Sequence, residues 1–171
     1  MSTQRSRVVI NALVIGVMLV WGLWLLGRGK SIADYTLSLL SDKPIASTCE
    51  TFGMDAPSVA KVGWSQEPTH SWSDRRDAYI ALTLPAMPRG GAIDMNVIAL
   101  PGEQATFRID QGAVLSIKSA RQLRLPFGSR QAGPILIKIN VEKPKRPSGE
   151  DRRWLGIAVK NLRVVSATCQ P

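Results

Sequence analysis

Histidine and cysteine are scarce in this chain, and their scarcity excludes several kinds of site. The 171 residues include one histidine, His70, and two cysteines, so a histidine-rich metal site is excluded. No serine motif of the nucleophile-elbow type and no glycine-rich phosphate loop is present. Glu67 with Asp74 or Asp77 is a weak candidate for a hydrolytic carboxylate pair, because sequence does not show their separation. We therefore expect a protein that is not an enzyme and that binds no metal and no cofactor.

Acidic residues are fewer than basic ones. The chain has 13 Asp and Glu against 22 Lys and Arg, which gives a formal net charge of +9. A basic domain near a bilayer has three simple explanations: anionic lipid head groups, an acidic polymer, or an acidic partner protein. Nucleic acid is not expected, because no recognised binding signature is present. The densest basic run, residues 143–147, is typical of a solvated turn, and a binding role for it is the less favoured interpretation.

Charged side chains are absent from the twenty residues between Val8 and Gly27. An α-helix of that length is about 30 Å long, the thickness of a bilayer's hydrocarbon core. Trp21 and Trp24 lie near one end of the run, where amphipathic rings favour the membrane interface. A cleaved secretory signal is the alternative, but the run exceeds the usual roughly 7–15 apolar residues, and no small-x-small cleavage site follows it. We therefore predict one uncleaved transmembrane helix at 8–27.

The two cysteines, Cys49 and Cys169, stand at the first and nearly the last position of the part that follows the predicted span. First and last strands are often neighbours in a small β domain, so a disulfide is favoured over two unrelated buried thiols. A disulfide indicates an oxidising compartment. Basic residues flank the span on both sides and do not decide its orientation. The disulfide and the short tail at 1–7 predict a cytoplasmic N-terminus and a C-terminal domain outside the cytoplasm. If the source is a Gram-negative bacterium, the span lies in the inner membrane and the domain in the periplasm.

The rest of the chain divides into a linker and one domain. In the linker, residues 28–47, apolar residues at helical spacing within Ser31–Ser41 predict a short amphipathic helix. From 48 to 171, short apolar runs end at proline and glycine turns. Seven such runs, with no amphipathic helix among them, predict an all-β domain built as an antiparallel two-sheet sandwich. The predicted strands are residues 78–84, 93–100, 105–109, 113–119, 122–126, 135–141 and 155–165.

Two motifs stand out in this domain, GWSQEPTHSWS at 63–73 and EDRRWLGIAV at 150–159. In this order they resemble an extracytoplasmic β-sandwich domain, jelly-roll and carbohydrate-binding-like, of bacterial surface-polysaccharide proteins. The resemblance covers roughly residues 48–165, and such domains are often attached to membrane glycosyltransferases. This chain has a single predicted span, whereas such domains are often fused to a transferase with several spans. The resemblance therefore implies an accessory subunit of polysaccharide synthesis or export, which binds glycan or docks on a membrane glycosyltransferase.

Four side chains of the first motif are candidates for a sugar site. Trp64 and Trp72 would form a stacking platform, with Glu67 and His70 bonding to hydroxyl groups. Aromatic rings stack on the C–H faces of pyranose rings, and a carboxylate accepts hydrogen bonds from hydroxyls. The alternative is an edge-strand hairpin whose rings cover the core; it is favoured for Trp64 and stays open for Trp72.

The second motif suggests structural roles. Glu67 and Arg152 are expected to pair and so tie the early loop to the last strand, an interpretation favoured over a ligand role for either residue. Asp151 is expected to cap the turn before the last strand, and Gly156 to permit the close approach of another backbone. The competing functional interpretation is a structural subunit of another multi-protein membrane complex, with the sandwich as a protein-docking surface.

Overall fold

The computed structural model describes residues 44–45, 47–146 and 151–169. The chain divides into two units, Met1–Thr36 and Leu37–Pro171, and all the described residues lie in the second. The predicted membrane span at 8–27 and the predicted linker helix at 31–41 fall outside the described residues and stay predictions. Within the described ranges, no helix has the length and apolar character needed to cross a membrane.

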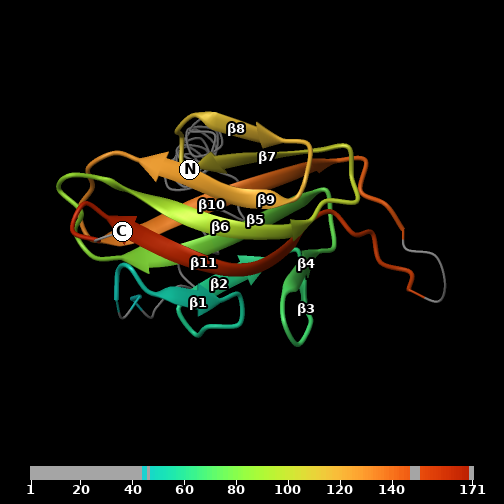
Figure 1. Ribbon diagram of the computed structural model, residues 1–171, viewed down its shortest axis with the longest axis horizontal. Helices are drawn as coiled ribbons and strands as arrows, with labels where there is room; N and C mark the ends of the chain where they lie inside the picture. Colours follow the sequence, from blue (N-terminus) through green and yellow to red (C-terminus); the bar gives the residue numbers. More distant parts are fainter. Residues whose placement is uncertain (1–43, 46, 147–150, 170–171) are drawn as a thin grey trace, which may run out of the picture. The chain divides into compact units, whose positions relative to one another are not determined.

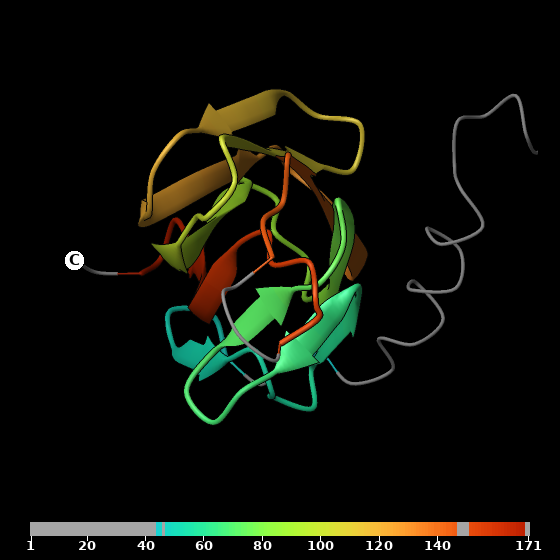
Figure 2. The same ribbon diagram turned by 90° about the vertical axis from the view of Figure 1, so that its right-hand side faces the viewer.

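Eleven strands in the described part of the chain form two antiparallel sheets that pack face to face (Figures 1 and 2). The five-stranded sheet has the order β2-β5-β10-β7-β8, and the six-stranded sheet has the order β3-β4-β11-β6-β9, with β1 also paired to β11. The first sheet contains β2 (Val59–Val62), β5 (Asp77–Leu84), β7 (Gln104–Ile109), β8 (Val114–Ile117) and β10 (Gly133–Glu142). The second contains β1 (Thr51–Gly53), β3 (Trp64–Gln66), β4 (Ser71–Ser73), β6 (Gly91–Ala99), β9 (Arg121–Phe127) and β11 (Ala158–Ser166).

The predicted all-β, antiparallel two-sheet class is confirmed, and each of the seven predicted strands corresponds to an observed one. The last strand differs at its start, since β11 begins at Ala158 and not at Leu155. Leu155 instead pairs with Lys145, and the Gly156 N–H donates to the carbonyl of Ser73 at 2.9 Å. The residues just before β11 therefore bond to β4 and to the segment after β10, and so join the second motif to the first.

The hydrophobic core fills the space between the two sheets. Burial alternates along β10, with isoleucines buried at every second position and Lys138 and Asn140 on the opposite, outer face. Phe107 on β7 and Met95 on β6 are fully buried and face the same core from the two sheets. Burying a side chain of this size contributes about 1.5–3 kcal/mol. The alternation also determines which polar side chains gather on the outer faces.

The predicted disulfide is confirmed between Cys49 and Cys169, whose Cα atoms lie 5.4 Å apart. Pairing of the first strand with the last explains why the cysteines meet, because β1 lies antiparallel to β11 with Phe52 opposite Leu162. The Cys49 N–H also donates to the carbonyl of Val164 at 2.7 Å. The bond therefore joins the two ends of the domain at a place where the sheet already holds them together.

Candidate functional site

The β3–β4 hairpin carries all four residues that the sequence singled out as sugar contacts. Trp64 pairs with Ser73 and Ser65 with Trp72 in the antiparallel register. At the tip, the Glu67 N–H donates to the His70 carbonyl at 2.9 Å across the Pro68-Thr69 turn. Because paired residues share a face, Trp64 lies on one face of the hairpin and Trp72 on the other. The two tryptophans therefore do not form one platform.

Trp64 faces inward. Its half-buried ring packs against the hydrophobic core, and its indole N–H donates to the carbonyl of Tyr79 at 3.0 Å. A ring held in this way joins the hairpin to β5 of the other sheet. The structure therefore places Trp64 in the structural role that the alternative interpretation of the motif described.

Trp72 and His70 lie together on the outer face. Their ring centroids are 5.6 Å apart, with the planes at 74° in an edge-to-face arrangement. Both side chains are half-buried, and the Thr69 hydroxyl lies 3.0 Å from His70 Nδ1. Such a pair holds the indole ring in a preferred aromatic geometry. Trp72 is thus oriented by its neighbour and remains partly open to solvent.

Glu67 is held by Arg153, and not by Arg152 as the sequence suggested. Arg153 Nη2 donates to Glu67 Oε1 at 3.0 Å and to Asp151 Oδ2 at 2.7 Å. The Asp151 carboxylate also accepts the Arg153 N–H at 3.0 Å, as an aspartate does when it caps a turn. This turn directs the Arg153 side chain to the hairpin, whereas Arg152 is exposed. Position in the turn distinguishes the two neighbouring arginines, and sequence does not show it.

The hydrogen bonds within this cluster shift the ionisation of its members. Side-chain and backbone hydrogen bonds from Arg153 lower the pKa of Asp151 to about 2. Hydrogen bonds to Asp151 and Glu67 raise the pKa of Arg153 above its usual range. Arg153, in the second motif, therefore holds the Glu67 carboxylate of the first motif in place.

Arg153→Gln is expected to raise the pKa of Asp151 from about 2 toward its ordinary value of 3.8, because it removes the side-chain donors. A carboxyl whose pKa is depressed in the folded state contributes stability above its unfolded pKa and loses that contribution as pH falls through the folded value. The stabilising effect of Asp151 should therefore be complete above pH 3.8, decrease as the pH falls below that value, and be lost near pH 2. A carboxyl ¹³C NMR titration measures both midpoints.

Arg152→Gln is the matched control for this titration, since it removes the same charge from the neighbouring, exposed position. The Asp151 midpoint should stay near 2 in this variant. An Asp151 midpoint close to 4 in the unchanged protein would contradict the cluster. So would equal shifts in the two arginine variants.

The last residue pair before the hairpin tip, Gln66 and Ser71, is tied to the five-stranded sheet. Lys61 on β2 donates to the Met54 carbonyl at 2.8 Å and to the side chains of Gln66 and Ser71. Burial is the main cause that lowers the pKa of Lys61, and the charge of Asp55 opposes it. These bonds fix the hairpin just below its tip, so that Glu67, His70 and Trp72 are presented from a supported position.

The hairpin site presents groups that can bind a ligand. Among the described residues there is no group of three or more histidine, cysteine or carboxylate side chains placed to hold a metal ion. Asp74 accepts a hydrogen bond from Ser65 at 3.1 Å, and Asp77 accepts one from Asn140 at 2.9 Å. The arrangement provides an aromatic edge, an imidazole and an oriented carboxylate, which together suit a hydroxylated ligand.

No family model matches the chain, and no curated protein matches its sequence. A family two carbohydrate esterase from Cellvibrio japonicus aligns at 15% identity over 70% of this chain and 33% of its own, with a TM-score of 0.44. A GH26-CBM35 β-(1,4)-mannanase from Podospora anserina aligns at 12% identity over 71% and 28%, also at 0.44.

A third structure, the C-terminal CBM6 of LamC, a marine laminarinase from Zobellia galactanivorans, aligns at 11% identity over 68% of this chain and all of its own, with a TM-score of 0.44. This chain spans a third or less of the first two proteins. The function is therefore argued from the residues of the site.

Proposed function

We propose that this protein is a membrane-anchored accessory subunit of bacterial polysaccharide synthesis or export, and that its periplasmic domain binds glycan without catalysing a reaction. The observation that carries the proposal is the cluster of Trp72, His70 and Glu67 on one face of the β3–β4 hairpin. The proposed anchor is the apolar run at 8–27. The Cys49–Cys169 disulfide supports a periplasmic position for the domain.

The chemistry of the cluster supports a sugar ligand. Trp72 presents a partly exposed aromatic ring, which can stack on the apolar face of a pyranose. Glu67 uses Oε1 to accept from Arg153, and its second oxygen has no protein hydrogen bond among the described residues. That oxygen is available to accept a hydrogen bond from a sugar hydroxyl. Ring and carboxylate are both held before a ligand arrives, which reduces the entropy lost on binding.

Trp72→Ala is expected to weaken glycan retention by roughly tenfold, the effect of losing an aromatic contact worth about 1.4 kcal/mol. The experiment uses the full-length protein in neutral detergent on an array of immobilised neutral and acidic bacterial polysaccharides. Leu115→Ala is the matched control, because Leu115 is an exposed apolar residue on the other sheet. Retention by this variant should equal that of the unchanged protein.

Protein docking is the competing function, and the same experiment separates it from glycan binding. If Trp72→Ala and Glu67→Ala leave retention untouched, the hairpin is not a sugar site. If replacing residues 8–27 with an unrelated apolar span then abolishes co-purification of a membrane partner, docking becomes the better description. Release of oligosaccharide from the array by the protein would instead indicate hydrolysis and contradict a purely binding role.

A further inference from the structure

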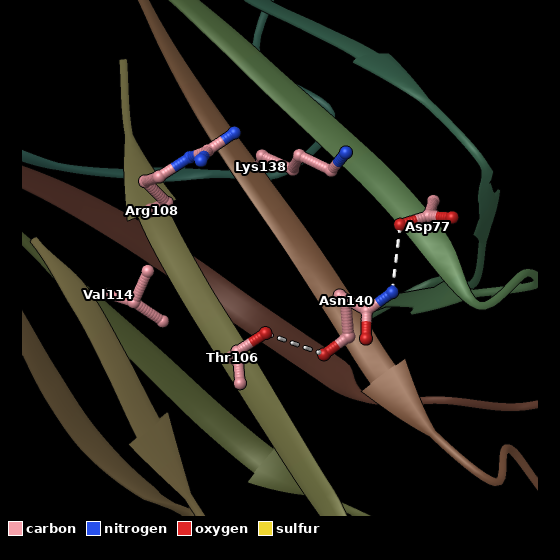
Figure 3. A pocket seen from close by; sticks show the side chains of 6 residues that line it. All are labelled: Asp77, Thr106, Arg108, Val114, Lys138 and Asn140. Atoms are coloured by element: carbon pink, nitrogen blue, oxygen red, sulfur yellow. Dashed lines mark hydrogen bonds between the residues drawn. The ribbon is translucent and has the colours of Figure 1, made fainter. Parts of the chain in front are cut away.

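The outer face of the five-stranded sheet contains a second polar site, separate from the hairpin. Side chains from β5, β7, β8 and β10 line a shallow hollow of about 270 Å³ (Figure 3). Its lining residues are Asp77, Thr106, Arg108, Val114, Lys138 and Asn140. Sequence alternation placed Lys138 and Asn140 on one face of their strand, but it did not show which side chains stand beside them.

Strand register arranges these side chains in two rows across the sheet. Lys138 on β10 stands between Arg108 on β7 and Tyr79 on β5. Two residues further along β10, at a distance of roughly 7 Å, Asn140 stands between two other residues of the same neighbouring strands, Thr106 and Asp77. The first row therefore carries the two cations, and the second carries two uncharged polar side chains and the Asp77 carboxylate.

The two cations in the first row lack a carboxylate partner. Neither Arg108 nor Lys138 forms an ion pair with any described residue, and Arg108 Nε is buried without a hydrogen-bond partner. Lys138 Nζ lies 5.6 Å from the centroid of the Tyr79 ring. Figure 3 shows Arg108 reaching from β7 towards β10, and Lys138 reaching from β10 towards β5. A guanidinium without a carboxylate partner suits bidentate binding of a carboxylate or another oxyanion, and the ammonium on the neighbouring strand adds positive charge to the hollow.

The second row suits hydroxyl groups. Asn140 Nδ2 donates to Asp77 Oδ1 at 2.9 Å, and the Thr106 hydroxyl donates to the Asn140 backbone carbonyl at 3.4 Å. The Asn140 amide oxygen and the second oxygen of Asp77 have no protein hydrogen bond among the described residues. These two oxygen atoms can accept hydrogen bonds from the hydroxyl groups of a ligand.

We propose that this hollow binds an acidic sugar residue of a polysaccharide, with its carboxylate on Arg108 and Lys138 and its ring hydroxyls on Asp77 and Asn140. The spacing between the two rows is comparable with the span of one pyranose ring. This inference rests on the proposed function, since it names the substrate class and adds a second contact on the other sheet. It also gives part of the net positive charge of the chain a role, because that charge would attract an acidic polymer.

The test is isothermal titration of the full-length protein in neutral detergent with a hexamer of galacturonic acid and with the same hexamer after its carboxyl groups are reduced to alcohols. The unchanged protein should bind the acidic hexamer at least tenfold more tightly than the reduced one. Arg108→Gln should remove most of this preference. Arg108→Lys, which keeps the charge and loses the planar fork, should weaken binding by an intermediate amount.

Lys160→Gln is the matched control, because Lys160 is an exposed cation on β11 in the other sheet. Its affinity should change by less than twofold. Equal losses in the Lys160 and Arg108 variants would mean diffuse attraction and would overturn the site. Binding to phosphatidylglycerol vesicles that Arg108→Gln abolishes, without binding to the hexamer, would mean a lipid headgroup ligand and would also overturn it.

The two proposals fail in distinguishable ways. If the protein binds neutral glycans through Trp72 but shows no preference for the acidic hexamer, only the acidic-sugar site is wrong. If it binds neither hexamer nor any polysaccharide of the array, the glycan-binding function fails as well. Circular dichroism of each variant shows whether it has folded, so that a loss of binding is assigned to the altered side chain.

Discussion

Replacing both cysteines, Cys49→Ser together with Cys169→Ser, is expected to lower the free energy of unfolding of the domain by about 4–5 kcal/mol. The disulfide joins residues separated by 120 positions. Closing a loop of this length removes a large number of conformations from the unfolded chain, and this loss is the main source of the stabilisation. The expected fall in Tm is on the order of 15 °C for a domain of this size.

Thermal unfolding of the full-length protein in detergent, followed by tryptophan fluorescence, measures the effect. Reduction and alkylation of the unchanged protein should reproduce the loss seen in the double variant, because both remove the same constraint. A decrease of less than 1 kcal/mol would contradict the prediction. Free thiols at both positions in freshly lysed cells would contradict the periplasmic position proposed for the domain.

Gly156→Ala is expected to destabilise the domain by about 2–3 kcal/mol, because an added Cβ has no room. That atom would lie 2.3 Å from Ser73 Oγ and 2.9 Å from Val141 Cγ2. Ser73 Oγ accepts a hydrogen bond from the Ile157 N–H at 2.9 Å, and all of these atoms are buried. The substitution therefore breaks the contact between β4 and the start of β11, and the Tm should fall by about 10 °C.

Gly128→Ala is the matched control for this prediction. A Cβ at Gly128 meets no atom within 4 Å, so the free energy of unfolding should change by less than about 0.5 kcal/mol. Denaturant unfolding of both variants gives the difference directly. A Gly156→Ala protein as stable as the Gly128→Ala protein would show that the segment before β11 shifts freely, and the close approach would then have no structural importance.

The Gly156 contact also affects the candidate site. It holds the middle of the second motif against β4, and the turn just before it places Arg153 within hydrogen-bond distance of Glu67. A variant that loosens this segment should therefore weaken glycan retention along with stability. Trp72→Ala differs from it, because that change removes a partly exposed ring from the outer face and leaves the core intact.

Strand positions were largely predictable from the sequence because each strand has its own local pattern. Alternation in 135–141 and the proline after Leu84 are visible without any knowledge of partners. The four strands before residue 77 are only three or four residues long, too short to show a period of two. Each exists through pairing with a partner strand: β1 and β4 pair with the distant β11, β2 pairs with β5, and β3 pairs with β4.

Only the part of the candidate site that depends on local contacts was predicted from the sequence. The motif at 63–73 identifies a hairpin, and its residues bond within the hairpin itself. The choice of Arg153 over Arg152 depends on a turn around Asp151, and the hollow on the other sheet depends on the register of β5, β7 and β10. Neither feature leaves a local signal, so sequence reasoning did not find them.

By itself, the sequence determined the all-β class, the cysteine pair and the residues of the hairpin, because hydrophobic alternation and turn chemistry act between neighbours in the chain. Only the tertiary structure decided that Trp64 packs inward while Trp72 stays open. It also decided that Arg108 and Lys138, which have no carboxylate partner, stand on neighbouring strands of the five-stranded sheet. The physical reason is that strand register and turn conformation are set by packing across the whole sandwich, where residues distant in sequence compete for the same face.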